Sequence, residues 1–454
     1  MWTPDLQSRP GPRYVALADA IAVAVRSGEL APGARLPPRR ALARRLGLNL
    51  TTVSRAYDLA AEMGLVSGEV GRGTFVRLLP DPGRVPWPAP DATARVDLSS
   101  NFPFPAASAA ELARALAPLA HGRGAMDLLR YEPSGALPAH RDAGRAWLAG
   151  LGVDAPSDRL LITSGAIHAI FVTLLALTRP GDRVLVEDLT SPALIGACNV
   201  LGLRAEGIAL DAEGMRPDAL AAALARDRAK AVVLVPNLQN PTLAVMSRKR
   251  RHALVELARR HAVTLIEDDA YGALLAPDER LPPLAALAPE RVCYTTSLSK
   301  AVAPGLRIGF LLVPAALQAA ALSALRVSTW MTSPLLAHVA ASWIGDGTAA
   351  ALAARQREVA ARRQALAAQR LAGFERLAHP RALHVWLRLP EPWRADEFAA
   401  YVQARGVDVL ASGSMAVDPG LRPAAVRISL CNVESEERLD HGLRTVAQAL
   451  GGRG

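Results

Sequence analysis

Lys300 is the residue whose type most strongly suggests covalent chemistry. The chain contains 52 basic residues, and only three are lysines, at positions 230, 249 and 300. A primary amine can form an imine with an aldehyde and a guanidinium cannot, so a lysine among arginines invites a chemical explanation. Ser297 and Arg307 lie close by in sequence and could both address a phosphate. This combination suggests pyridoxal phosphate; the alternative is a solvated lysine in a strand-to-loop connection.

The elements around Lys300 are predicted to form an α/β domain with a mostly parallel sheet. Short apolar runs that alternate with helical patterns occur at residues 159–163, 183–187, 231–235, 264–268 and 292–295, with a helix expected over 167–177. Near-continuous apolar strands joined by helical crossovers are typical of a buried parallel sheet. Ligands of such sheets bind at the carboxyl ends of the strands.

Polar residues stand at those strand ends. Ser164, Gly165 and Ala166 follow the first strand and open a helix, whose N-terminus could hold a phosphate. Asp268 follows the fourth strand, and its carboxylate could keep a pyridine nitrogen protonated. Asn240 and Tyr271 could hydrogen-bond the ring's phenolic oxygen. Arg307 could bind the phosphate through two hydrogen bonds.

The N-terminal eighty residues have a different pattern. Three helices are expected at residues 14–26, 39–46 and 49–63, followed by short strands at 65–67 and 73–77. Residues 10–80 hold ten arginines against five acids, a net charge of 10 − 5 = +5. Three helices closed by a β-ribbon make a winged helix-turn-helix, and its positive charge can neutralise the phosphates of double-stranded DNA.

Ordered motifs in this region resemble the GntR family of winged-helix repressors. They are Pro-Gly-x-x-Leu-Pro, Leu-Ala-x-x-Leu-Gly, Thr-Val-x-Arg-Ala-Tyr and Gly-Arg-Gly-Thr-Phe-Val. The resemblance implies DNA contacts by Arg40, Thr51, Thr52, Arg55, Arg72 and Gly73. Leu50 departs from the family, which usually has arginine there; a leucine can touch a thymine methyl but cannot bind guanine through two hydrogen bonds.

Length and composition predict two domains joined by a linker. A chain of 454 residues exceeds what one core usually fills, and 51% hydrophobic content excludes global disorder. Five prolines fall in residues 79–96, which predicts an extended, semi-rigid spacer. We therefore expect a DNA-binding domain at 10–78, the linker at 79–96 and a second domain at 97–454.

With these residues in place, the second domain resembles the fold-type I aminotransferases, and the whole chain resembles the MocR subfamily of GntR regulators. The resemblance implies a large lobe with a smaller α+β lobe, and pyridoxal 5'-phosphate as cofactor. Lys300 would bind the cofactor covalently and Asp268 would hold the pyridine nitrogen. Asn240 and Tyr271 would bind the ring oxygen, and the phosphate would be held by Ser164, Gly165, Ala166, Ser297 and Arg307.

Two further residues match family motifs. Tyr131, in Tyr-Glu-Pro-Ser-Gly, matches a tyrosine that reaches the phosphate of a neighbouring subunit, which implies a homodimer. Arg427, in Val-Arg-Ile-Ser, matches the arginine that binds a substrate carboxylate. Ser191 replaces a tyrosine that often stacks on the ring, and Ile167 replaces a common glutamine. Stacking must then come from another residue, for which His168 is the candidate, or be weaker.

The sequence shows no pattern typical of a targeting segment or a metal site. No signal peptide is visible, and the most apolar run, residues 160–178, contains Ser164, Gly165 and His168 and suits a buried strand and helix better than a membrane span. Cysteines 198, 293 and 431 have neither zinc nor disulfide spacing. We expect a cytoplasmic protein with no metal site.

Three functions follow from the sequence. The first is a transcription regulator that binds pyridoxal phosphate and senses an amino acid or related amine. The second is a working aminotransferase that carries a DNA-binding domain. The third is a sensor of pyridoxal phosphate itself. Ser191 favours sensing, whereas turnover with a keto acid would favour catalysis.

Overall fold

The computed structural model describes most of the chain as two compact units. The first is formed by Met1–Arg84 with Asp418–Leu421, and the second by Val85–Val417 with Arg422–Gly454. The described residues are 2–4, 6, 12–26, 29–30, 34–62, 65–69, 73–76, 95–120, 123–132, 135–418 and 420–452. Residues 79–94 of the expected linker therefore lie outside the described residues, as does Arg72.

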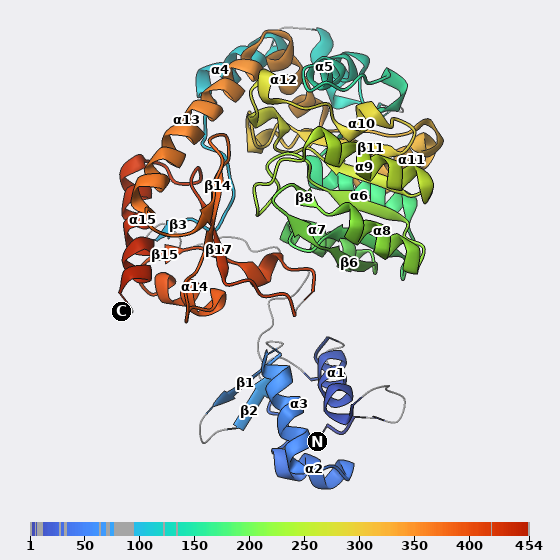
Figure 1. Cartoon of the computed structure of the whole chain (residues 1–454). Helices are drawn as coiled ribbons and strands as arrows, with labels where there is room; N and C mark the ends of the chain where they lie inside the picture. Colours follow the sequence, from blue (N-terminus) through green and yellow to red (C-terminus); the bar gives the residue numbers. More distant parts are fainter. Residues whose placement is uncertain are drawn as a thin grey trace. The chain divides into compact units, whose positions relative to one another are not determined.

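The first unit contains the expected three helices and β-ribbon (Figure 1). Its elements are α1 (Arg13–Arg26), α2 (Arg39–Leu46), α3 (Leu50–Glu62), β1 (Val66–Glu69) and β2 (Gly73–Val76). Gly47 ends α2 in the left-handed conformation, at φ 62°. Leu17, Ile21, Leu42 and Val53 are fully buried between the helices. This small apolar core fixes α3 against α1 and α2.

The second unit has a large lobe built on a seven-stranded sheet (Figure 1). In spatial order its strands are β4 (Leu160–Thr163), β12 (Gly309–Leu312), β11 (Val292–Ser297), β10 (Thr264–Asp268), β9 (Ala231–Leu234), β5 (Arg183–Glu187) and β6 (Arg204–Ile208). β12 runs antiparallel to both of its neighbours, and the other pairs are parallel. The mostly parallel sheet is confirmed, whereas β6 and β12 were not expected from the sequence.

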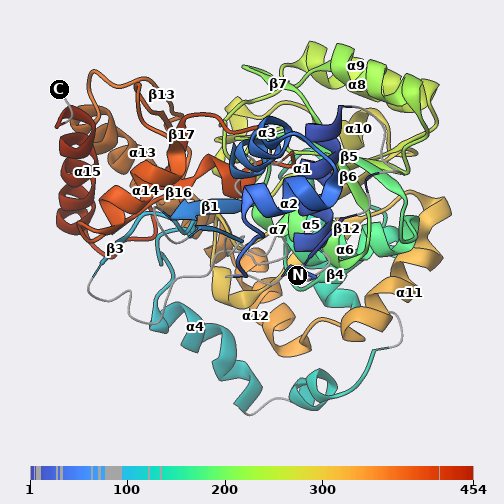
Figure 2. The same ribbon diagram turned by 90° about the horizontal axis from the view of Figure 1, so that it is seen from below.

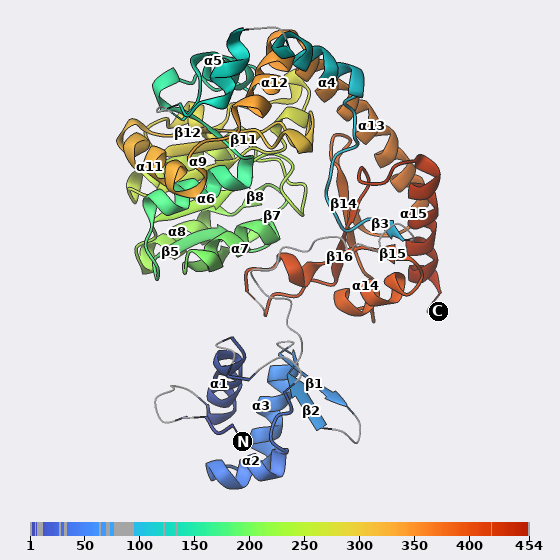
Figure 3. The same ribbon diagram turned by 180° about the vertical axis from the view of Figure 1, so that it is seen from behind.

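Alternate residues of each strand enter two separate hydrophobic cores, one on each face of the sheet. On one face Leu161, Val233 and Cys293 pack with α6 (Ala166–Leu177), α7 (Pro192–Val200) and α11 (Gln318–Thr329). On the other face Ile162 and Val232 pack with α5 (Pro138–Ala149), α8 (Pro217–Arg226), α9 (Arg248–Arg260) and α10 (Leu284–Leu287). Burial on both faces explains why these strands are continuously apolar. Figure 3 shows the lobe from behind.

The smaller lobe is α+β, as the resemblance implied. Its four-stranded antiparallel sheet has the order β13 (Arg376–Leu377), β14 (His384–Arg388), β17 (Ala425–Ser429) and β16 (Leu410–Ala411). β3 (Val96–Asp97) pairs with β15 (Val407–Asp408) beside it. The helices α13 (Thr348–Arg370), α14 (Ala395–Gln403) and α15 (Glu436–Gly451) pack beside these strands, on the side away from the large lobe (Figures 1 and 2). α4 (Ala109–Leu116) and α12 (Pro334–Gly345) complete the unit.

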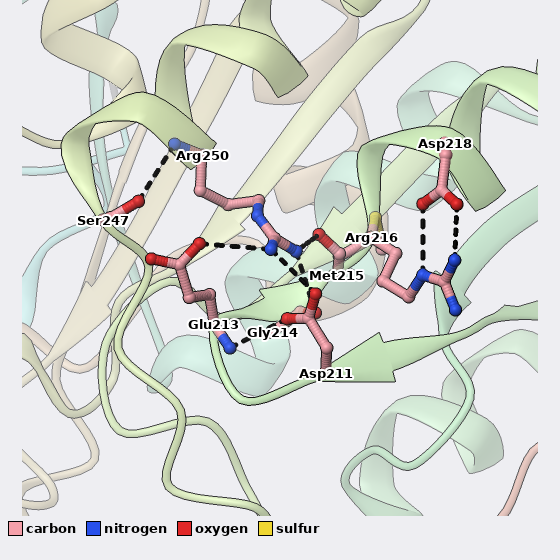
Figure 4. Close-up of polar contacts among 8 residues, drawn as sticks. All are labelled: Asp211, Glu213, Gly214, Met215, Arg216, Asp218, Ser247 and Arg250. Atoms are coloured by element: carbon pink, nitrogen blue, oxygen red, sulfur yellow. Dashed lines mark hydrogen bonds and ion pairs between the residues drawn. The ribbon is translucent and has the colours of Figure 1, made fainter.

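A charged cluster fastens a hairpin of the large lobe to α9 (Figure 4). The hairpin is β7 (Leu210–Asp211) and β8 (Gly214–Met215). Arg250 Nη2 contacts the carboxylates of Asp211 at 2.8 Å and Glu213 at 3.1 Å, and its Nη1 donates to Met215 O at 2.9 Å. Beside it, Arg216 and Asp218 form an ion pair that is largely solvent-exposed. The contacts of Arg250 thus link the hairpin to α9, whereas the ion pair of Arg216 and Asp218 joins residues that are close in sequence.

Candidate cofactor site and nucleic-acid interface

Lys300 follows β11 and enters a polar cluster between the two lobes. Its Nζ donates to the carbonyl oxygen of Asn101 at 2.6 Å and lies 5.8 Å from the centroid of the Tyr271 ring. Burial, reinforced by the positive charge of Arg427, lowers the pKa of Lys300 to about 8. A lowered pKa makes the neutral, nucleophilic amine more abundant near neutral pH.

The two adjacent carboxylates at the end of β10 have different environments. Asp268 accepts one hydrogen bond, from the backbone N–H of Ala270 at 3.1 Å, and stays partly solvent-exposed. Asp269 is buried and accepts from Asn237 Nδ2 at 2.7 Å and the Tyr294 hydroxyl at 2.5 Å. Only Asp268 therefore keeps an oxygen for a ligand.

Burial raises the pKa of Asp268 to about 6, and the neighbouring Asp269 adds to this while Lys300 opposes it. Because the pKa is raised in the folded state, stability should fall as pH rises from about 4 through 6. The cofactor-free Asp268→Asn variant lacks this titrating group. Its free energy of unfolding relative to that of the wild type should therefore rise by on the order of 1 to 3 kcal/mol between pH 4.5 and pH 7.5. Urea unfolding at both pH values tests this, and a constant difference would contradict it.

Asn101, which the sequence did not single out, links the lobes beside Lys300. Its Nδ2 donates to the Tyr271 hydroxyl at 3.0 Å and contacts His384 Nδ1 at 3.2 Å. The other ring nitrogen of His384 lies 3.1 Å from Pro241 O. Burial raises the pKa of Tyr271 to about 12, so its hydroxyl is protonated. The large-lobe and small-lobe walls of the site are thus hydrogen-bonded through one amide.

Arg427 and Asn240 meet at the same place. Arg427 Nη1 donates to Asn240 Oδ1 at 3.0 Å, and Nη2 donates to Ser99 O at 2.6 Å. Burial lowers the pKa of Arg427 to about 10, which leaves it charged at neutral pH. Its Nε is buried without a hydrogen-bond partner among the described residues. A buried cation with a donor to spare suits a carboxylate.

The expected phosphate residues also converge. Arg307 Nη2 donates to Ser164 O at 2.9 Å and Nη1 to Ser299 Oγ at 3.2 Å. Gly165 has φ 91°, and a Cβ there would lie 2.4 Å from Arg307 Nη2. Ser297, by contrast, is buried, and its hydroxyl accepts from the backbone N–H of Ser299 at 3.4 Å. Ser299 is therefore a further candidate for phosphate binding that the sequence did not suggest.

The phosphate turn is braced from two sides. A Cβ at Gly309 would lie 2.6 Å from the carbonyl carbon of Gly165. Only a glycine at position 309 therefore lets β12 approach the turn this closely. Ala166 begins α6 directly after Gly165, and this places the helix N-terminus at the turn. His168 Nδ1 accepts from the Ser164 N–H at 3.0 Å, and Nε2 lies 2.9 Å from Ser328 Oγ. Both ring nitrogens of His168 are thus engaged.

The two departures from the family pattern have local roles. Ser191 is the N-cap of α7, and its hydroxyl accepts from the Ala193 N–H at 3.3 Å. Ile167 packs against the core between the sheet and α6, α7 and α11. Neither supplies a ring that could stack on a cofactor.

Tyr131 stands apart from this cluster. Its side chain is 77% exposed, and its ring meets that of Trp330 edge-on at 5.7 Å between centroids. Further exposed apolar side chains in these two segments are Met126, Leu129 and Val327. Tyr131 is thus available on the surface rather than directed at Lys300 of its own chain.

The donor set fits pyridoxal phosphate. The site brings together an amine with a lowered pKa, a carboxylate with an unused oxygen, a neutral tyrosine and a guanidinium at a glycine turn. These groups match an aldehyde, a pyridinium nitrogen, a phenolic oxygen and a phosphate respectively. Among the described residues no group of His, Cys, Asp and Glu could hold a metal ion.

In the first unit, the exposed face of α3 carries the expected DNA contacts. Thr51 and Arg55 are exposed one turn apart, and Thr52 is half-buried. The Arg55 guanidinium lies 4.2 Å from the centroid of the Tyr14 ring of α1. Leu50, the departure from the family, is 42% exposed at the start of the helix. Residues on this face can reach a DNA groove without unfolding the core.

A hollow of about 440 Å³ lies where α2 turns into α3. Its lining includes Arg40, Arg44 and residues 47–50. Gly73 begins β2 with φ 120°, and a Cβ there would lie 2.7 Å from Arg35 Nε. Arg35 thus packs against the β-ribbon, a contact that the sequence did not suggest. Across the described residues, no helix is long and apolar enough to cross a membrane.

Comparisons with known families agree with the two-unit architecture. Residues 95–446 match the family described as aminotransferase class I and II. Residues 13–76 match the bacterial regulatory proteins of the gntR family.

Individual relatives include regulators and an aminotransferase. The HTH-type transcriptional regulator YdeF of Bacillus subtilis (strain 168) is 30% identical over 99% of this chain and 96% of its own length. The vitamin B6 salvage pathway transcriptional repressor PtsJ of Salmonella typhimurium is 32% identical over 64% of this chain and 65% of its own. The structure of the α-aminoadipate aminotransferase LysN of Thermus thermophilus, complexed with N-(5'-phosphopyridoxyl)-L-leucine, has a TM-score of 0.71 at 25% identity, covering 79% of this chain and 93% of that one.

Proposed function

Because the chain belongs to the MocR-type regulators, in which a GntR DNA-binding domain is fused to an aminotransferase domain of class I and II, we propose that it binds pyridoxal phosphate at Lys300 and senses an amino compound there. The observation that carries this proposal is the meeting of Lys300, Asp268, Tyr271 and Arg427 in one cluster. The cofactor derivative in the LysN structure supports it. We propose residues 10–78 as the DNA-binding domain, 79–96 as the linker and 97–454 as the sensing domain.

Each residue of the cluster has a role in this proposal. Pyridoxal phosphate supplies an electron-withdrawing ring that activates a bound amine. Lys300 would hold the aldehyde carbon, and Asp268 would keep the ring nitrogen protonated. Tyr271 and Asn240 would hydrogen-bond the ring oxygen. The phosphate would be held by Ser164, Gly165, Ala166, Ser297, Ser299 and Arg307.

The effector is proposed to be an amino acid or a related amine. Arg427 would bind its carboxylate, using the Nε that has no partner. The carboxylate would then compete with Asn240 Oδ1 and Ser99 O for the Arg427 guanidinium. These contacts join the two lobes, so effector binding would change how tightly the lobes close.

The regulator is proposed to act as a cytoplasmic homodimer. Tyr131 is exposed together with Trp330, Leu129 and Val327, and apolar side chains grouped in this way are typical of an interface. In the homodimer Tyr131 would reach the phosphate of the partner subunit. Analytical ultracentrifugation of the purified protein tests this, and a monomer at micromolar concentration would argue against it.

Arg55 is expected to contribute directly to operator binding. Arg55→Ala should weaken binding by about 1 to 3 kcal/mol if the side chain reaches a base. Arg388→Ala is the matched control, because it removes an exposed arginine from the second unit. Fluorescence anisotropy with an operator selected from random-sequence DNA by the wild-type protein measures both. Equal affinities would remove Arg55 from the interface.

Two other functions, an active aminotransferase and a sensor of pyridoxal phosphate itself, are each favoured by one observation. The cluster around Lys300 contains the groups that half-transamination needs, including a lysine able to move a proton. The name of PtsJ, a vitamin B6 salvage repressor, favours sensing of pyridoxal phosphate itself.

One experiment separates the three functions. Visible absorbance and operator affinity are measured with pyridoxal phosphate alone, and then with a panel of amino acids plus 2-oxoglutarate. A sensor of amino compounds changes both readouts with one amine and yields no glutamate. Glutamate formed over many turnovers identifies an aminotransferase, and a change in operator affinity with cofactor alone identifies a cofactor sensor.

A further inference from the structure

Three buried polar atoms in the segments that form the small-lobe wall of the site have no hydrogen-bond partner within the described residues. They are Asn101 Oδ1, Arg427 Nε and Ser429 Oγ. Leaving a buried polar atom unpaired costs about 1 to 3 kcal/mol, so each such atom calls for an explanation, such as an ordered water, an ion or a bound ligand. The carboxylate proposed above accounts only for Arg427.

The orientation of the Asn101 amide follows from the chemistry of its neighbours. Pro241 O can only accept a hydrogen bond, so the His384 Nε2 next to it must carry the proton. Burial lowers the pKa of His384 to about 3, so the ring is neutral and Nδ1 is an acceptor. The Asn101 atom beside Nδ1 must therefore be the NH2 group. The unpartnered atom is the oxygen, and it requires a donor.

Ser429 belongs to the same wall. It lies opposite His384 in the register of β14 and β17, and Arg427 lies opposite Trp386. Residues directly opposite in an antiparallel pair, and residues two apart on one strand, share a face of the sheet. Ser429 therefore lies on the face that bears Arg427 and His384. His384 in turn contacts Asn101.

We propose that Asn101 Oδ1 and Ser429 Oγ bind a hydrogen-donating side chain of the amino compound, so that the ligand is an amino acid with a hydroxyl or amide side chain. This rests on the proposed function, because Arg427 takes the carboxylate of the same ligand. An aliphatic side chain would leave the amide oxygen and the hydroxyl unpaired. The site therefore penalises apolar ligands strongly and not merely by a weaker fit.

Pairs of similar shape test this specificity. Wild-type protein loaded with pyridoxal phosphate is titrated with L-threonine against L-valine and with L-asparagine against L-leucine. The readout is the concentration that half-saturates the change in visible absorbance. We expect at least one polar member to act at a concentration tenfold or more below its apolar partner. Equal responses in both pairs would overturn the inference while leaving the proposed function intact, whereas no cofactor absorbance at all would overturn the proposed function.

Ser429→Ala removes a hydroxyl that has no partner, so it should not lower the stability of the protein. It should, however, weaken the preference for the polar ligand. Urea unfolding of the cofactor-loaded protein without amino acid should give unchanged or higher stability, and the preference for the polar ligand should fall at least fivefold. The matched control is Ser412→Ala, because the Ser412 hydroxyl is buried in the same lobe and donates to Pro423 O at 2.6 Å. The control should lose stability and keep the preference. An unchanged preference in Ser429→Ala would overturn the role of Ser429.

A bound water is the competing explanation for the unpaired atoms, and the same data decide it. A water that stays in place would stabilise the free protein through Ser429, so Ser429→Ala would then lower stability and leave the ratio of polar to apolar affinities unchanged. That pair of results would overturn the proposal.

Discussion

Replacing Lys300 by alanine should abolish the visible absorbance band of lysine-bound pyridoxal phosphate. No arginine can substitute, because a guanidinium does not form an imine with the cofactor aldehyde. Lys249→Ala is the matched control, since Lys249 is an exposed lysine on α9. It should keep the band in full. An unchanged band in Lys300→Ala would place the cofactor elsewhere and remove the central assignment.

The same substitution should leave the cofactor-free fold intact. The pKa of Lys300 is lowered from 10.5 to about 8 by burial, so the folded state disfavours the charged amine. The unfolded chain binds more protons between pH 8 and 10.5, and the stability of the wild type rises with pH across that window. Below pH 8 the alanine variant should be as stable as wild type or more stable, and this difference should shrink towards pH 10.5. Urea unfolding at pH 7 and pH 10 measures it.

Much of the large lobe could be predicted because its signals are local. The strands at 183–187 and 264–268 have the bounds expected from their apolar runs, and Asp268 and Lys300 stand at strand ends as expected. β12 was missed because its four residues directly follow the motif that contains Lys300 and Arg307. A strand that short carries no alternation by which it could be recognised.

The small-lobe wall of the site could not be predicted from local patterns. Asn101 meets Tyr271 across 170 residues and His384 across 283. The segment that contains Asn101 has no periodic pattern, and nothing local distinguishes its amide from that of a surface asparagine. His384 stands at the start of an ordinary buried strand. Only the packing of the two lobes brings these side chains to Lys300, and only the packing reveals which of their atoms lack partners.

In the DNA-binding unit, too, the helices and strands could be predicted from local sequence patterns and the long-range contacts could not. Three helices and two strands follow from helical spacing, Gly47 and Asn49, and the expected bounds of α2 are those observed. The contact between Arg55 and Tyr14 joins helices that lie far apart in sequence, so it could not be inferred. Because this contact orders the guanidinium before DNA is present, the entropy lost on binding should be smaller.

A second large effect is expected behind the cofactor site, at the fully buried Arg251. Its Nη2 donates to Asn237 Oδ1 at 2.6 Å, and Asn237 in turn donates to the Asp269 carboxylate. Nε and Nη1 donate to the carbonyls of Met246 and Pro282. This chain of bonds holds the ends of β9 and β10, and therefore the loops that carry Asn240 and Asp268.

Arg251→Ala should reduce the free energy of unfolding by about 3 to 5 kcal/mol, because it leaves the Asn237 amide oxygen and buried backbone carbonyls without their donor and removes the positive charge that faces the buried Glu267 and Asp269. Arg216→Ala is the control: its ion pair with Asp218 is largely exposed, and its loss should cost at most about 1 kcal/mol (Figure 4). Urea unfolding of cofactor-free protein gives both values. Adding Asp269→Asn to Arg251→Ala should recover part of the loss, since it removes the uncompensated charge. If the double variant is no more stable than Arg251→Ala, the loss comes from packing rather than from the network that supports Asp268.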